Sequence, residues 1–210
     1  MGHIAEGEAG YAIIGLSRKD TNAAALAAAA VKSGCRAVRL ELCGKGAWSA
    51  KELEGLKKGL AALGEALVLG ILKGHPLHLV NFEEAEDAAG GCGIFTGRLL
   101  ADGEGNYMLV PPQWRYDGRG VKLGHADKGI AKFNGCAYDA ASAACAECLR
   151  KNLAGTGYDA KATLEFDLGV RKALESIKYL AKSKPVFKAY LERVRQERER
   201  ESGLLINEKK

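Results

Sequence analysis

The chain has 210 residues, of which 47% are hydrophobic, 27% are charged and only 7% are aromatic. This composition is typical of a globular protein with its own core and excludes a chain that is disordered throughout. The net charge of +5 is too small for a histone-like polycation, and the apolar runs are too short to cross a bilayer. With no hydrophobic leader and six dispersed cysteines, the sequence predicts a soluble, cytoplasmic protein without a membrane partner.

The first 90 residues alternate between strand-like and helix-like segments. Two short runs, YAIIGL and AVRLEL, have the length of strands, and AVRLEL alternates apolar and charged residues as a half-buried strand does. An alanine-rich helix is expected between them at 23–32. A second helix is capped by Ser49, carries leucines at helical spacing and is expected to end at Gly64. We expect strands at 11–16, 37–42 and 66–72, with a further short strand within 74–80. This βαβαβ order favours a parallel sheet with right-handed crossovers.

The remaining segments predict a central β-meander followed by helices. The turn sequence ADGEG at 101–105 joins expected strands at 94–100 and 106–110, and shorter strands are expected at 121–123 and 130–133. Helices are expected at 140–153, at 164–182 and from 185 onward. In the last helix Phe187, Leu191 and Val194 are expected to pack, and the chain is expected to fray from residue 203. The fold class is therefore α/β or α+β. Residues 1–90, 91–135 and 136–210 are either three lobes or parts of one continuous domain.

The spacing of the cysteines and histidines indicates whether the chain could bind a metal ion or form a redox pair. Cys145 and Cys148 form a C-x-x-C, with Cys136 nine residues earlier, but no second such pair completes a four-ligand zinc site. His75 and His78 are spaced too loosely to supply it. The cysteines lie in an alanine-rich helical pattern, so we favour buried thiols and expect no metal and no cofactor.

No known catalytic signature accompanies the histidines. His125 precedes Asp127 by two residues, an arrangement that is common at strand ends without catalysis. The sequence therefore does not decide whether the protein is an enzyme.

The central segment carries the first functional hypothesis, a nucleic-acid-binding or nucleoprotein-assembly protein without catalytic activity. Aromatic side chains on a sheet can stack on bases of single-stranded DNA or RNA, while arginine and lysine neutralise phosphates. The alternative is that Tyr107 and Trp114 fill the core. The predicted binding residues are Arg98, Tyr107, Trp114, Arg115, Tyr116, Arg119 and Lys122.

The second hypothesis is a small α/β enzyme that binds a phosphorylated or anionic substrate where the parallel strands end. Ligands bind at this edge of parallel sheets, and a glycine-rich turn before a helix can hold an anion. The predicted anion-binding residues are Ser17, Arg18, Gly44 and Lys45.

The C-terminal tail supports a third hypothesis, a structural subunit of a larger complex. Residues 184–210 carry 8 basic and 5 acidic residues, with alternating charges at 196–201. This pattern is typical of a solvated helix or a helix that pairs with a protein partner or with a second copy of the chain.

Overall fold

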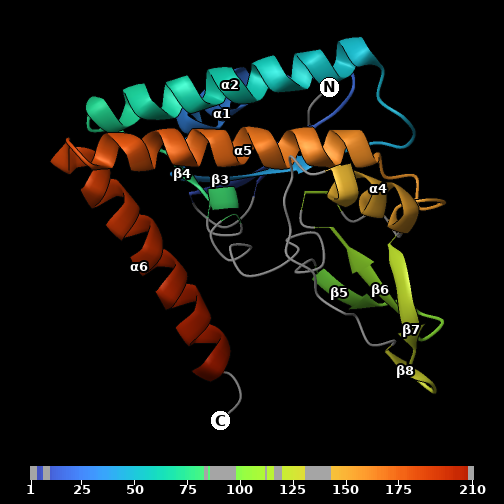
Figure 1. Cartoon of the computed structure of the whole chain (residues 1–210). Helices are drawn as coiled ribbons and strands as arrows, with labels where there is room; N and C mark the ends of the chain where they lie inside the picture. The colour runs from blue at the N-terminus through green and yellow to red at the C-terminus, as the bar shows by residue number, and fades with distance from the viewer. Residues whose placement is uncertain are drawn as a thin grey trace.

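The computed structural model describes residues 4–6, 10–82, 85, 98–111, 113–115, 120–130 and 143–207. It confirms the mixed α/β fold class, with an N-terminal layer of strands and helices, a central antiparallel sheet and C-terminal helices (Figure 1). One hydrophobic core contains residues from the first sheet, from the helices and, through Val110 and Trp114, from the central segment.

The first sheet has the strand order β1-β2-β3-β4. Its parallel strands are β2 (Tyr11–Leu16), β3 (Ala37–Leu42) and β4 (His78–Leu79), and β1 (Ile4–Glu6) pairs antiparallel with β2. The helix α1 (Ala23–Lys32) connects β2 to β3 and has the predicted bounds. The βαβαβ order is therefore confirmed.

The expected third strand at 66–72 is wrong, because these residues belong to the long helix α2 (Ala50–Leu72). A capping box between Ser49 and Glu52 begins the helix as predicted. Gly64 does not end it. The apolar run continues the buried helical stripe, which consists of Leu56, Leu60, Leu63, Leu67 and Ile71. The strand that completes the βαβαβ unit is β4, inside the segment where a further short strand was expected.

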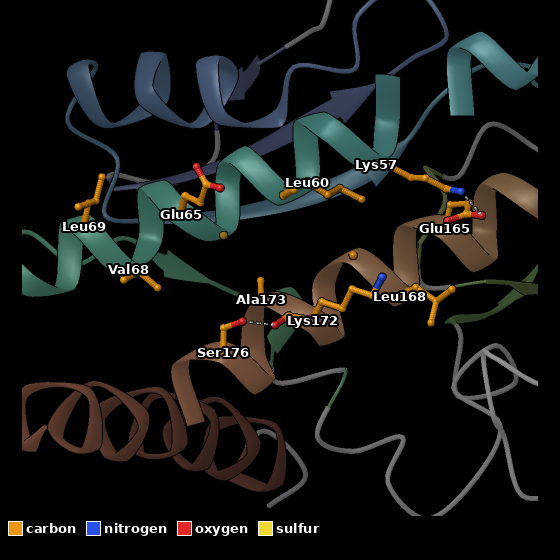
Figure 2. A pocket seen from close by; sticks show the side chains of 13 residues that line it. Lys57, Leu60, Glu65, Val68, Leu69, Glu165, Leu168, Lys172, Ala173 and Ser176 are labelled. Atoms are coloured by element: carbon orange, nitrogen blue, oxygen red, sulfur yellow. Dashed lines mark hydrogen bonds and ion pairs between the residues drawn. The ribbon is translucent and has the colours of Figure 1, made fainter. Parts of the chain in front are cut away.

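The helix α5 (Ala160–Ala181) lies beside α2 and runs parallel to it (Figure 1). It begins four residues earlier than expected, because Asp159 caps it by accepting a hydrogen bond from Ala162 N. Glycine permits the close contact, since Gly169 lies directly against the side chain of Leu60. The Lys57 Nζ–Glu165 Oε1 ion pair, at 3.1 Å, joins the two helices near their N-termini (Figure 2).

Two more helices complete the C-terminal region. The helix α4 (Ala143–Asn152) precedes α5, and α6 (Pro185–Asn207) leaves the end of α5 at a steep angle (Figure 1). Phe187 and Val194 anchor the first half of α6 in the core, as predicted. The helix extends to Asn207, whereas fraying was expected from residue 203.

The second sheet has the antiparallel order β5-β6-β7-β8 and confirms the predicted meander. Its strands are β5 (Arg98–Ala101), β6 (Asn106–Val110), β7 (Val121–His125) and β8 (Gly129–Ile130). The predicted turn at 101–105 is present, and the Asp102 carboxylate closes it by accepting hydrogen bonds from Glu104 N and Asn106 N. The expected strand residues 94–97 and 131–133 lie outside the described residues.

Candidate functional site on the parallel sheet

The free edge of β3 is completed by three different partners in succession. The strand β4 pairs with Ala37 and Val38 at the start of β3. Next, the side-chain amide of Asn81 bonds both backbone groups of Leu40. At the end, Leu42 N donates to Gln113 O at 2.6 Å, and Arg115 N donates to Leu42 O at 2.9 Å. Residues 113–115 therefore extend the parallel sheet at the carboxyl end of β3, with Trp114 paired to Leu42.

The two faces of this sheet differ in polarity. One face carries Val38, Leu40 and Leu42, which are fully buried in the hydrophobic core. Strand alternation directs Arg39 and Glu41 to the opposite face. The strand register adds His78 to that face, because His78 pairs with Ala37. Gln113 lies in the turn that leads into the Trp114 bridge, and its backbone carbonyl accepts from Leu42 N. We call this set the polar face. It consists of the strand residues Arg39, Glu41 and His78 together with the adjacent turn residue Gln113.

The polar face is buried. Arg39 Nε lies 3.1 Å from Glu41 Oε1, and the two side chains are 15% and 3% exposed. Burying an ion pair costs desolvation free energy that its attraction only partly offsets, so such a pair is weak support for a purely stabilising role. Among the described residues, no hydrogen-bond partner reaches the buried Oε1 of Gln113. Buried polar groups normally have partners, so this oxygen is suited to a ligand or water.

Three exposed cations lie on the segments that leave the carboxyl edge of the sheet. Arg18 follows β2, Lys45 follows β3, and Arg115 follows the Trp114 bridge. The edge is continuous, because Cys43 N donates to Leu16 O at 2.7 Å. We call Arg18, Lys45 and Arg115 the edge cations. Within the described ranges none of them forms an ion pair of 4.0 Å or less with a carboxylate.

The structure therefore places residues from two separate predictions at the same edge of the parallel sheet. Ser17, Arg18, Gly44 and Lys45 were predicted as an anion site, and Arg115 was predicted to bind nucleic acid. The bridge between Leu42 and Trp114 brings Arg115 to the same edge as the anion-site residues. Ser17 is half-buried there, and its hydroxyl accepts a hydrogen bond from Asp20 N.

The N-terminus of α2 is already capped by carboxylates of the protein. Ser49 N donates to Glu52 Oε2 at 2.6 Å, and Trp48 N donates to Asp159 Oδ2 at 2.9 Å. The hydrogen bond from the Ser49 backbone lowers the pKa of Glu52 most, followed by the bond to the Ser49 side chain, and Arg18 lowers it further by charge attraction. The protein's own carboxylates therefore already occupy the N-terminus of α2.

Trp114 occupies the core, the alternative weighed for it in the sequence. Its side chain is fully buried, and its Nε1 donates to Thr163 Oγ1 at 2.8 Å. The indole also stacks on Tyr158 with 5.0 Å between ring centroids. A ring held in this way does not present a face to a nucleic-acid base.

Three other predicted nucleic-acid residues lie on adjacent strands of the second sheet. Tyr107 is half-buried on β6, Lys122 is exposed on β7, and the backbone of Arg98 begins β5. Tyr116 and Arg119 lie outside the described residues.

His78 belongs to the polar face, but the other cysteine and histidine motifs do not converge with that face or with the edge cations. Cys145 and Cys148 are half-buried in α4, while Cys136 lies outside the described part of the chain. In the part that is described, no three His, Cys, Asp or Glu side chains are placed to hold a metal ion. His125 contacts two neighbouring turns: its Nε2 lies 3.0 Å from Glu104 O in the β5–β6 turn, and its Nδ1 lies 3.3 Å from Asp127 Oδ2 in the β7–β8 turn.

An open apolar groove of about 890 Å³ lies between α2 and α5 (Figure 2). Small residues form its floor, and Ala173 points from α5 toward α2 next to Gly64. Leu69 is 54% exposed at one end of the groove. The groove is a surface feature of the helix pair and is formed by neither the polar face nor the edge cations.

Sequence reasoning missed the polar face. The alternation in AVRLEL was interpreted as that of a half-buried strand, but the structure also buries the side that carries Glu41. Two charged residues of opposite sign, two apart in a strand of a predicted parallel sheet, are a signal that could have indicated it.

No described helix is both long and apolar enough to span a membrane. Comparison of the chain with models of known protein families, with curated proteins and with solved structures finds no match.

Proposed function

We propose that this protein binds a small phosphorylated ligand at the carboxyl edge of its parallel sheet, as a small α/β enzyme would bind its substrate. The observation that carries the proposal is the convergence of Arg18, Lys45 and Arg115 on three neighbouring parallel segments. Among the described residues these cations have no carboxylate within 4.0 Å, which favours an anionic group at this edge, although Glu52 attracts Arg18 from a greater distance. Open parallel sheets place ligands there.

The polar face supports the same position. Arg39 and Glu41 form a buried ion pair two residues below the edge, where a purely structural sheet would carry apolar side chains. Polar groups beneath a charged rim are typical of sites that orient a ligand.

Calorimetric titration of the full chain with inorganic phosphate and pyrophosphate tests the proposal. Each of the substitutions Arg18→Ala, Lys45→Ala and Arg115→Ala is expected to weaken binding by about tenfold or more, because each removes a charge-assisted hydrogen bond. Lys73→Ala is the matched control, since Lys73 is exposed just beyond the opposite end of α2. Equal effects of all four substitutions, or no phosphate binding by the wild type, would reject the site.

A second candidate function, binding of a single-stranded nucleic-acid backbone, is favoured by the exposure of Lys122 on β7 and of Arg115 at the sheet edge. Fluorescence anisotropy with labelled single-stranded and duplex oligonucleotides at two salt concentrations tests it. Binding that weakens with salt and with Lys122→Ala supports this function. Binding that is absent at low salt, or unchanged by that substitution, counts against it.

A further inference from the structure

The buried amide of Gln113 restricts what kind of phosphorylated ligand fits this site. Gln113 is only 5% exposed, and its Oε1 has no donor within the described segments. Leaving a buried acceptor unsatisfied is unfavourable, so a donor group belongs next to it. The edge cations are donors themselves, and the phosphate they would hold has only acceptor oxygens to offer.

Two buried acceptor residues lie on neighbouring segments beneath the edge. Because Trp114 pairs with Leu42 in parallel register and Gln113 O accepts from Leu42 N, the backbone of Gln113 lies next to that of Glu41. The Glu41 carboxylate is 3% exposed and accepts from Arg39. A carbonyl oxygen beside a carboxylate attracts hydroxyl or amine hydrogens and repels a second phosphate.

Arg115 follows Gln113 by two residues at the end of the same short segment. Its side chain is exposed whereas that of Gln113 is buried, so the segment carries a cation at the surface and an amide beneath the surface. A ligand that contacts both carries its anionic group at Arg115 and a hydrogen-bond donor at Gln113.

We infer that the ligand is a hydroxylated phosphate monoester, of the polyol phosphate or sugar phosphate class. Its phosphate contacts the edge cations, and one of its hydroxyl groups donates to Gln113 Oε1. This inference rests on the proposed phosphate site and adds to it the chemistry of the rest of the ligand.

The test compares two ligands that differ in their hydroxyl groups. Calorimetric titration of the full chain uses glycerol 3-phosphate, ethyl phosphate and inorganic phosphate as probes. The wild type is expected to bind glycerol 3-phosphate about tenfold more tightly than ethyl phosphate, the effect of satisfying a buried acceptor. Equal affinities would overturn the inference while leaving the phosphate site intact. Absence of binding by all three probes would reject both proposals.

The variant Gln113→Met tests whether the side-chain amide of Gln113 causes the preference for glycerol 3-phosphate over ethyl phosphate. Methionine has a similar volume without a strong acceptor, so the substitution suits a buried position. We expect the variant to bind glycerol 3-phosphate and ethyl phosphate with similar affinity, so that the tenfold preference is lost. Thermal unfolding of the variant checks that it is folded at the titration temperature. A folded variant that keeps the tenfold preference would show that Gln113 is not the acceptor.

Discussion

The side chain of Asn81 takes the place of a strand residue beside Leu40. Its Oδ1 accepts a hydrogen bond from Leu40 N at 2.8 Å, and its Nδ2 donates to Leu40 O at 3.0 Å. Asn81 is 3% exposed, so water does not substitute for these bonds. One amide thus links the part of β3 covered by β4 to the part covered by residues 113–115.

Replacing Asn81 by leucine should therefore destabilise the protein strongly. The change leaves one N–H and one C=O group of Leu40 buried without partners, and we expect a loss of about 2–4 kcal/mol in the free energy of unfolding. Urea denaturation measures this loss. The control is Asn22→Ala, which removes an exposed N-cap bond to Ala25 N and should cost about 1 kcal/mol. Equal losses for both variants would show that the Leu40 groups find other partners.

The strand β3 could be predicted from the sequence, whereas the groups that pair with its edge could not. Local patterns predicted α1, β2, β3 and β6 with their observed bounds, because alanine content and alternation act over neighbouring residues. The apolar run at 66–72 was misassigned because seven apolar residues do not distinguish a buried strand from a helix. Its helical state depends on contacts with α5, which lies a hundred residues later in the chain.

The site depends on still longer-range contacts. Arg18 and Lys45 could be predicted, since they directly follow predicted strands that are neighbours in a parallel sheet. Arg115 and Gln113 could not be placed with them, because no local pattern indicates that residues 113–115 pair with Leu42. Burial of Arg39 and Glu41 likewise depends on tertiary structure, since charged residues alternating in a strand usually face solvent.

The buried tryptophans provide a spectroscopic prediction. The chain has 2 tryptophans, and Trp48 and Trp114 are 5% and 0% exposed. We expect blue-shifted emission that acrylamide quenches weakly, and added oligonucleotide should not quench Trp114 by stacking. Strong quenching in the folded protein would contradict the burial of both rings.

Substitution of these tryptophans separates hydrogen bonding from packing. Trp114→Phe removes the bond to Thr163 Oγ1 together with part of the ring, and should cost about 2–4 kcal/mol by denaturant unfolding. Trp48→Phe is the matched change at a second buried ring. In the described structure the Trp48 indole makes no hydrogen bond, so Trp48→Phe should lower the free energy of unfolding less than Trp114→Phe does. A larger loss at Trp48 would contradict a role for the Thr163 bond.

The contact between α2 and α5 predicts that replacing glycine by alanine changes the free energy of unfolding differently at two positions. In a helix interior without close neighbours, replacing glycine by alanine favours folding by about 1 kcal/mol. At Gly169 the added Cβ would lie 2.6 Å from Leu60 Cδ1 and 2.9 Å from Leu60 Cβ, so we expect a net loss of about 1–2 kcal/mol. At Gly64 the nearest atom is Ala173 Cβ at 3.2 Å, and the change should be within about 0.5 kcal/mol of neutral. Thermal unfolding of the two variants tests this order, and a stabilised Gly169→Ala protein would contradict the close packing.

The capping box of α2 predicts an acid-dependent loss of stability. Hydrogen bonds with the Ser49 backbone and side chain, and the charge of Arg18, lower the pKa of Glu52. A carboxyl whose pKa is lower in the folded state stabilises the fold above its unfolded pKa, about 4.3, and loses this contribution as the pH falls through the folded value. Carboxyl NMR titration should show a lowered pKa for Glu52 that rises toward its ordinary value in Ser49→Ala.

Unfolding measured at pH 7 and pH 3 completes the prediction for Glu52. Glu52→Gln should be less stable than the wild type at pH 7, because it lacks the carboxylate that faces the α2 amides and Arg18. The difference should shrink at pH 3, where Glu52 of the wild type becomes protonated. Glu65→Gln removes a charge from the exposed middle of α2 and is the control for a general effect of helix charge. If the Glu52→Gln difference stays constant with pH, its carboxylate does not stabilise the start of α2 by charge.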